Sequence, residues 1–319
     1  MLLPRFVVWI SSVGLMVLGA GTVPGQSFPN KPIRIVTSAP GGGADLVARV
    51  IAQGISGPLG QQVVVDNRTG GAILGDIVSK APPDGYTLLL TGSFWILPLI
   101  QKVSFDPVRD FAPITLASTE PNVLVVHPTV AAKSVKELIA SAKARPGELN
   151  YSSGPSGGTA HLAGELFKAM AGINIVRIPY KGGGPALNGL LSGEVQLTFS
   201  SASSVALYAK SGRLKALAVG SAEPSVLAPG LPTVAASGLP GYESVSINGI
   251  FVPAGTPAPI VKRLNHEIVR VLNQADVKER LLNSGTEAIG SSPGQFATAV
   301  KSDLARMSKV LRDAGIHAE

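Results

Sequence analysis

Two segments of this chain share one pattern, in which an apolar stretch is followed by a glycine-rich turn and an amphipathic stretch. The first spans residues 33–49, with its glycine turn at residues 39–43, and the second spans residues 149–166, with its glycine turn at residues 154–158. Each pattern predicts a strand, a tight turn and a helix. Such a turn directs free backbone N–H groups at the positive end of a helix dipole, where an anion can bind. The pair therefore predicts two lobes that hold one small anion between them.

Length and composition agree with a two-lobed globular protein. The chain has 319 residues, more than a single hydrophobic core usually organises, and it is 45% hydrophobic and 15% charged. Its net charge is +7, but lysines and arginines are scattered and no basic run is interleaved with aromatic residues. This distribution argues against a nucleic-acid-binding protein. The positive charge could attract anions or simply favour solubility, and both explanations stay open.

The N-terminus has the features of an export signal. Arg5 precedes an uncharged apolar stretch at residues 6–20, and small residues follow it. We predict a signal peptide at residues 1–26, because the stretch is too short to span a bilayer comfortably as a membrane anchor. The chain has no cysteine and its four histidines are isolated. We therefore expect a periplasmic protein without disulfide, metal or cofactor.

Strand and helix patterns alternate along the rest of the chain. Outside the two glycine-turn segments, strands are predicted at residues 63–66, 86–91, 114–117, 123–127, 174–178, 195–199, 214–219 and 246–252. Helices are predicted at residues 73–80, 135–144, 204–210, 257–273, 276–283 and 293–314, and a further helix follows the loop at residues 179–184 and ends at Leu191. This alternation is typical of α/β proteins with parallel sheets, which bind ligands at the carboxyl ends of their strands.

An ordered set of short motifs resembles one known family. The motifs lie at residues 29–36, 39–42 with Asp45, 65–68, 83–88, 133–138, 161–167, 179–182 and 253–257. Together they resemble the Bug family, the extracytoplasmic receptors of tripartite tricarboxylate transporters. The resemblance extends over the whole chain that follows the predicted signal peptide.

The resemblance implies a two-lobed type II periplasmic-binding-protein fold, in which the chain crosses twice between the lobes. We expect the crossings near His127-Pro128 and at residues 242–248, so that lobe one comprises residues 27–127 and 249–319 and lobe two residues 128–248. The family captures small carboxylates, largely with backbone groups and bridging water. The implied partners are a small carboxylate ligand and the membrane permease subunits of such a transporter. The implied protein is a monomer without cofactor, and a sensing role instead of a delivery role stays open.

The candidate ligand-binding residues come from the two glycine turns and three other loops. They are Ala39, Pro40, Gly41, Gly42, Gly43, Asp45, Gly92, Ser93, Ser153, Gly154, Ser156, Thr159, His161, Tyr180, Lys181 and Ser200. The glycines would let the backbone approach a ligand closely. Tyr180 and Lys181 are candidates because they match the third binding loop of the family that the chain resembles.

Several of these residues have a structural alternative. Asp45 could accept a hydrogen bond from the ligand or pair with Arg49 one turn along the helix. Thr159 is the favoured N-cap of its helix. His161 is a candidate for ligand contact, although isolated histidines are more often structural. Lys181 could bind the anion or stay solvated.

The second glycine turn also matches the G-x-S-x-G elbow of serine hydrolases, with Ser156 as the nucleophile. Such an enzyme needs a histidine on a later loop. The later histidines are His266, inside a predicted helix, and His317, near the C-terminus. We therefore favour a non-catalytic receptor and keep the hydrolase as the alternative.

Two positions depart from the family pattern. Ser200 stands where many members have Asp, and Ile247 stands where many have Trp. The missing carboxylate could change which ligand is accepted. Trp95 follows a predicted strand end, so we expect it at the rim of the cleft; packing beneath the Pro98-Leu99 loop is the alternative.

Overall fold

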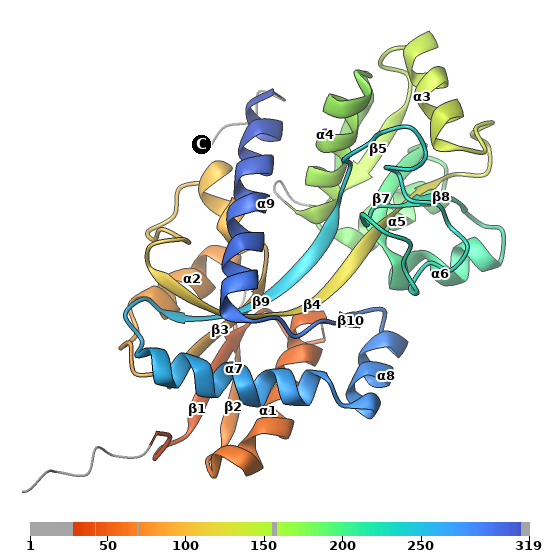
Figure 1. Cartoon of the computed structure of the whole chain (residues 1–319). Helices are drawn as coiled ribbons and strands as arrows, with labels where there is room; N and C mark the ends of the chain where they lie inside the picture. The colour runs from red at the N-terminus through yellow and green to blue at the C-terminus, as the bar shows by residue number, and fades with distance from the viewer. Residues whose placement is uncertain (1–27, 42, 69, 155–157, 314–319) are drawn as a thin grey trace, which may run out of the picture.

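The computed structural model describes residues 28–41, 43–68, 70–154 and 158–313, which form two α/β lobes (Figure 1). The two-lobed α/β architecture predicted from the sequence is confirmed. Two of the candidate residues, Gly42 and Ser156, lie outside the described residues.

The first sheet is built on three parallel strands. They lie in the order β2 (Val63–Asn67), β1 (Ile33–Thr37) and β3 (Thr87–Gly92). β9 (Val245–Pro253) adds to β3 in antiparallel orientation, and β4 (Phe111–Val126) pairs with β9. The carboxyl ends of β1 and β3 therefore lie at the same edge, where the first glycine turn and the Gly92-Ser93 loop begin.

Helices cover both faces of this sheet. One face carries α1 (Gly43–Leu59), α7 (Ala258–Leu272) and α8 (Ala275–Asn283); the other carries α2 (Gly71–Ser79), the 3-10 helix η1 (Phe94–Leu99) and α9 (Pro293–Asp313). Ile35 packs with the first group and Val36 with the second, as the alternation of side chains along a strand requires. Burial on both faces explains the nearly continuous apolar strands.

The second lobe repeats this design. β5 (Asn150–Ser153) lies between β6 (Val176–Pro179) and β7 (Leu197–Ser201) and is parallel to both. The end of β4 pairs in antiparallel orientation with β7 and with β8 (Lys215–Val219). α3 (Val135–Ala144) and α4 (Thr159–Ala171) share one core cluster. α5 (Gly183–Leu191) and α6 (Ala202–Lys210) share another. The N-termini of α4, α5 and α6 follow the carboxyl ends of β5, β6 and β7.

β4 belongs to both sheets. Its first part pairs with β9 as far as Pro121, and its last part, from Asn122, pairs with β7 and β8. The two strands predicted at residues 114–117 and 123–127 are thus one strand, and that part of the prediction was wrong. Pro121 lies where the strand changes partners, a position at which its missing N–H is tolerated. The change of partners precedes the predicted crossing near His127-Pro128.

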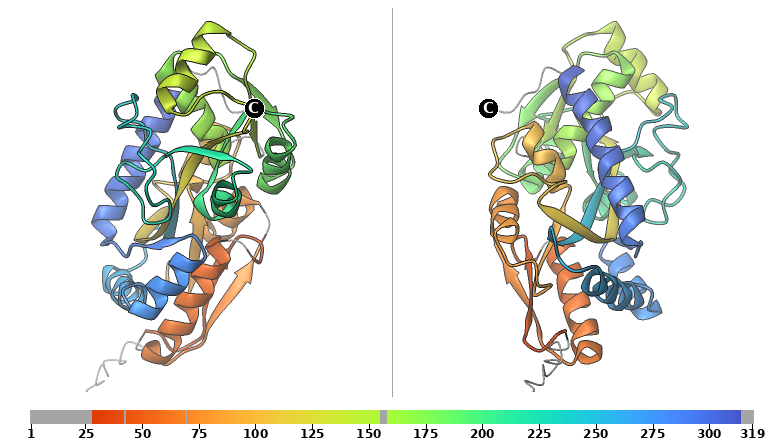
Figure 2. Two further views of the ribbon diagram at one scale, coloured as in Figure 1. Left: turned by 90° about the vertical axis from the view of Figure 1, so that its right-hand side faces the viewer. Right: turned by 60° about the vertical axis from the view of Figure 1, so that its left-hand side comes forward.

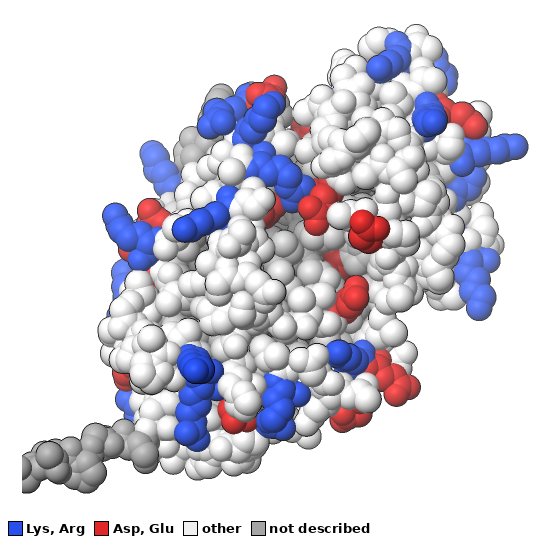
Figure 3. Space-filling model, viewed as in Figure 1, with Lys and Arg blue, Asp and Glu red and all other residues white. Residues whose placement is uncertain are grey.

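α9 lies along one side of the molecule and packs against β4, η1 and α4, so it contacts both lobes (Figures 1 and 2). β10 (Glu287–Ala288), which precedes it, pairs with β4. Among the described helices, none combines the length and apolar character that crossing a membrane requires. On the face drawn in Figure 3, lysines and arginines stand in separate groups with uncharged surface between them.

Candidate ligand-binding cleft

Two adjoining hollows mark the candidate site. We call the first the helix-end cavity, because the N-termini of α4, α5 and α6 meet there; its volume is about 230 Å³. We call the second the interlobe cavity; it has about 210 Å³ and lies between α4 on one side and η1 and α9 on the other. Thr159, the first residue of α4, lines both cavities.

The helix-end cavity is lined by hydroxyl and amide groups beside apolar side chains, and the described residues that line it carry no charge. Its polar side chains are Asn122, Thr159, Thr198, Ser200, Ser201 and Ser204. The N-cap residues of the three helices are Gly158, Gly182 and Ser201, and none of them makes a side-chain cap hydrogen bond. The first-turn N–H groups of three helices, with the positive ends of their dipoles, thus surround one cavity. Such a site can bind a carboxylate without a cationic side chain.

Thr159 was the favoured N-cap of α4, and this prediction was wrong. Gly158 occupies the N-cap position with an extended backbone, and Thr159 is the first helical residue. This difference in position matters, because the hydroxyl of an N-cap threonine would bond to the backbone of α4 itself. At its actual position, Thr159 borders the two cavities.

Serine hydroxyls cluster at the start of α6. Ser201 Oγ lies 3.2 Å from Ser203 Oγ and 2.7 Å from Ser204 Oγ. Ser203 donates to Glu120 Oε1 on β4 at 2.7 Å. Burial raises the pKa of Glu120, although the hydrogen bond from Ser203 opposes the shift. Four of the five residues at positions 200–204 are serines, but the sequence predicted a binding role only for Ser200.

An arginine that was not predicted as a site residue holds the end of β5 and Gly154. Arg177 on β6 donates from Nε to Ser153 Oγ at 2.7 Å and from its NH2 group to the Gly154 carbonyl at 3.0 Å. Ser153 in turn donates to the Gly154 carbonyl at 3.1 Å. The Ser153 hydroxyl is therefore engaged within its own loop. The sequence feature that could have indicated this role is a charged residue inside the short apolar strand predicted at residues 174–178.

His161 is buried, with 4% of its surface exposed. Burial and the nearby positive charge of Arg177 lower the pKa of His161 to about 4, so the imidazole is neutral at neutral pH. Among the residues that the structure describes as lining the two cavities, His161 does not occur. The burial of His161 and its absence from the described lining favour a structural role.

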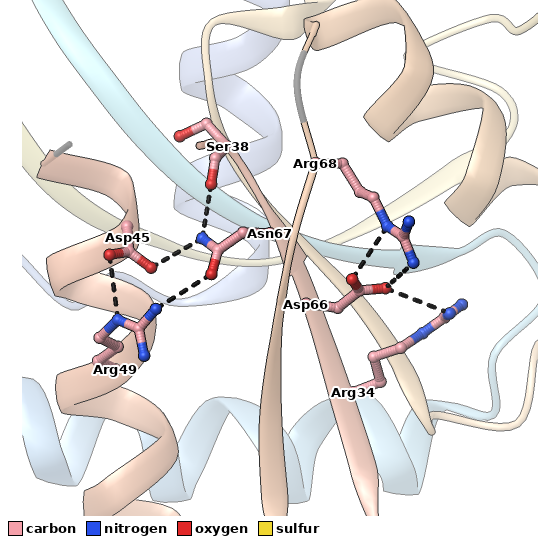
Figure 4. Close-up of polar contacts among 7 residues, drawn as sticks. All are labelled: Arg34, Ser38, Asp45, Arg49, Asp66, Asn67 and Arg68. Carbon is pink, nitrogen blue, oxygen red and sulfur yellow. Dashed lines mark hydrogen bonds and ion pairs between the residues drawn. The ribbon is translucent and has the colours of Figure 1, made fainter. Parts of the chain in front are cut away.

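Asp45 forms polar contacts with Arg49 and Asn67 near the start of α1 (Figure 4). Asp45 Oδ2 accepts hydrogen bonds from Arg49 Nε and, in the first glycine turn, from the Gly41 backbone N–H, both at 3.0 Å. Asn67 Nδ2 donates to Asp45 Oδ1 at 2.8 Å and to the Ser38 carbonyl at 2.7 Å. Burial alone would raise the pKa of Asp45, but the hydrogen bonds from Arg49, Gly41 and Asn67 outweigh it and lower the pKa. Of the two roles left open for Asp45, the pairing with Arg49 is the one observed.

The rest of the first glycine turn is exposed. Ala39, Pro40, Gly41 and Gly43 are all on the surface, and a Cβ at Gly43 would meet Thr286 Oγ1 at 3.6 Å. Gly41 has φ 86°, a conformation that favours glycine. These four residues are not among the described residues lining either cavity.

The Gly92-Ser93 loop lines the interlobe cavity as a predicted loop at a strand end should. Ser93 N–H donates to the Ile247 carbonyl at 3.1 Å. Trp95, expected at the cleft rim, is instead fully buried, and that prediction was wrong. Its indole packs edge-on against Phe94 and Phe296, and Nε1 donates to Asp303 Oδ2 at 2.8 Å. η1 continues directly from β3 and directs the ring into the core, where α9 supplies the polar partner.

Tyr180 and Lys181 do not occur among the described residues that line the two cavities. Tyr180 is directed at α5, since a Cβ on Gly189 would lie 2.2 Å from its hydroxyl oxygen. Lys181 is exposed. The structure thus brings Gly154, Thr159 and Ser200 together in the helix-end cavity, with Gly92 and Ser93 beside Thr159 in the interlobe cavity.

Comparison with known proteins identifies the family. Residues 47–316 match the model of the tripartite tricarboxylate transporter family receptor. This chain belongs to that family. It is 35% identical to the protein BugT of Bordetella pertussis over 96% of this chain and 97% of BugT, which confirms the resemblance to the Bug family.

Solved structures of family receptors share the fold. Rpa4515 of R. palustris, solved with adipate, is 35% identical with a TM-score of 0.78, covering 92% of this chain and 100% of Rpa4515. The periplasmic binding protein BugD is 31% identical with a TM-score of 0.75, covering 92% of this chain and 100% of BugD. The expected two-lobed periplasmic-binding-protein fold is therefore confirmed.

Proposed function

We propose that this protein is a periplasmic solute-binding receptor that captures a small carboxylate between its lobes and delivers it to the permease subunits of a tripartite tricarboxylate transporter. The observation that carries the proposal is the helix-end cavity, where three helix N-termini without side-chain caps surround an uncharged, hydroxyl-rich space. A carboxylate in this cavity would accept hydrogen bonds from first-turn N–H groups and from serine and threonine hydroxyls.

The family supports the same ligand class. Family membership indicates a receptor, and the related Rpa4515 was solved with adipate, a carboxylate. The predicted signal peptide at residues 1–26 supports the periplasmic location. The family match favours a receptor over the serine hydrolase alternative, for which the described residues offer no supporting observation.

The residues divide by proposed role. Thr159, Ser200 and the backbone of Gly154 contact the carboxylate directly. The first glycine turn, residues 39–43, approaches the ligand from lobe one when the lobes close, with Asp45 holding its shape. The division into lobes at residues 127 and 248 stays a prediction, and the pairing of β4 favours a first crossing at Pro121-Asn122. The monomeric state also stays a prediction.

A thermal-shift screen of the mature protein against organic acids tests this proposal. A ligand present at 100 times its dissociation constant adds about 2.7 kcal/mol to the free energy of unfolding. We expect at least one small carboxylate to raise Tm, with one site per chain by calorimetry. A screen in which no carboxylate stabilises the protein, or stoichiometric labelling by a fluorophosphonate, would contradict the proposal.

A further inference from the structure

We propose that the ligand is a monocarboxylate with an apolar body, and that the interlobe cavity holds this body while the helix-end cavity holds the carboxylate. This inference rests on the proposed function and names the ligand class within it. It departs from what Rpa4515 would suggest, since adipate carries a carboxylate at each end.

The two cavities are arranged to hold the two halves of one molecule. Thr159 lines both cavities, so a carboxylate bound at the N-terminus of α4 would have its body directed along the side of that helix. Both lobes contribute apolar walls to the interlobe cavity. Lobe one supplies Ile96 and Leu97 from η1, and lobe two supplies Leu162 and Leu166 from α4. Closing these walls over a hydrocarbon or aromatic body would remove its surface from water.

The charged side chains of the interlobe cavity argue against a second carboxylate. The described lining includes Glu243, Asp303 and Arg306, two carboxylates and one guanidinium. Arg306 already donates to Asp303 Oδ1 at 2.5 Å and to the backbone carbonyl of Glu243. Asp303 also accepts the hydrogen bond from Trp95. The guanidinium is thus committed within the protein, and a second ligand carboxylate would face a lining with excess negative charge.

Three ligands of equal chain length separate the possibilities on the unmodified protein. Hexanoate ends in a methyl group, adipate in a second carboxylate and 6-aminohexanoate in an ammonium group. By calorimetry at pH 7.5, we expect hexanoate to bind at least tenfold more tightly than adipate and more tightly than 6-aminohexanoate. Adipate binding as tightly as hexanoate would overturn the inference and leave the proposed function standing. Tightest binding of 6-aminohexanoate would also overturn it, in favour of an ion pair with Glu243. Failure of every carboxylate in the wider screen would instead overturn the proposed function.

A charge placed in the apolar wall gives the second test. Leu162→Lys introduces an ammonium group into the interlobe cavity, and we expect it to reduce the hexanoate preference over adipate by at least tenfold. Met170→Lys is the matched control, because Met170 lies on the same helix but is 37% exposed and outside the described lining of the cavity. The control should keep the wild-type preference. An unchanged preference in a folded Leu162→Lys variant would contradict the placement of the ligand body.

Discussion

The Nε atom of Arg177 lies 2.7 Å from the hydroxyl oxygen of Ser153, and this hydrogen bond ties the end of β5 to the neighbouring strand β6. The same guanidinium holds the Gly154 carbonyl at 3.0 Å. Gly154 lines the helix-end cavity, and its backbone is held there by the planar, permanently charged guanidinium of Arg177. The positive charge is thus one hydrogen bond away from Gly154, which lines the cavity proposed for the ligand carboxylate.

Replacement of Arg177 should therefore weaken carboxylate binding. Hydrogen bonds to charged groups contribute about 1.5–3 kcal/mol, so we expect Arg177→Gln to lower affinity on the order of tenfold. Arg177→Lys keeps the charge but loses the planar fork, and its effect should be intermediate. Calorimetric titration gives the affinities, and Arg145→Gln, at an exposed ion pair with Glu148, is the control. Wild-type affinity in Arg177→Gln would show that the guanidinium does not act on the site.

Loss of the Asp45 carboxylate should destabilise lobe one. Its two oxygens accept hydrogen bonds from Gly41, Arg49 and Asn67 while the side chain is buried. We expect Asp45→Ala to lower the free energy of unfolding by roughly 2 kcal/mol in urea denaturation. Asp313→Ala, which breaks an exposed pair with Lys309, should cost at most about 0.5 kcal/mol. Equal effects of the two substitutions would refute the role given to Asp45.

His161 should make stability depend on pH. The pKa is lowered from 6.5 to about 4 in the folded protein, so the unfolded chain binds the proton more readily. The contribution of neutral His161 to the free energy of unfolding is therefore fully present above pH 6.5 and is lost as pH falls towards 4. This loss amounts to at most roughly 3 kcal/mol. His161→Gln should flatten the change in unfolding free energy between pH 7 and pH 5. An identical pH profile in the variant would contradict this account.

Gly285 and Ser203 form a close contact between the loop after α8 and the start of α6. A Cβ added to Gly285 would lie 2.1 Å from Ser203 Cβ, and the φ of Gly285 is 81°. We expect Gly285→Ala to lower Tm, because both the overlap and the backbone conformation oppose it. Ser203→Gly in the same chain should recover part of the loss, since it removes the overlapping atom. Purely additive effects in this double-mutant cycle would show that the contact is not tight in solution.

The sequence predicted elements whose determinants are local. The strands buried on both faces and the helices that follow the two glycine-rich segments depend on residue spacing, and the structure has these strands and helices close to the predicted residues. The continuity of β4 could not be predicted, because Pro121 usually ends a strand and is tolerated here only by a change of partners. The burial of Trp95 depends on Asp303, which is distant in sequence. Arg177 could not be predicted for the same reason. Its role depends on hydrogen bonds to Ser153 and Gly154, which only the fold brings next to it.

A glycine that borders the helix-end cavity offers the most direct test of the central claim. A Cβ on Gly184, in the first turn of α5, would meet no atom within 4 Å, so Gly184→Leu should fill the cavity without disturbing the fold. Gly57→Leu is the matched control, because Gly57 is also helical and open but lies on α1, outside the described lining. The measurement is calorimetric titration of wild type and both variants with hexanoate and adipate. We predict one-to-one carboxylate binding by wild type and Gly57→Leu, and no measurable binding by a folded Gly184→Leu variant. Wild-type affinity in Gly184→Leu would contradict the claim that the ligand carboxylate binds where α4, α5 and α6 begin.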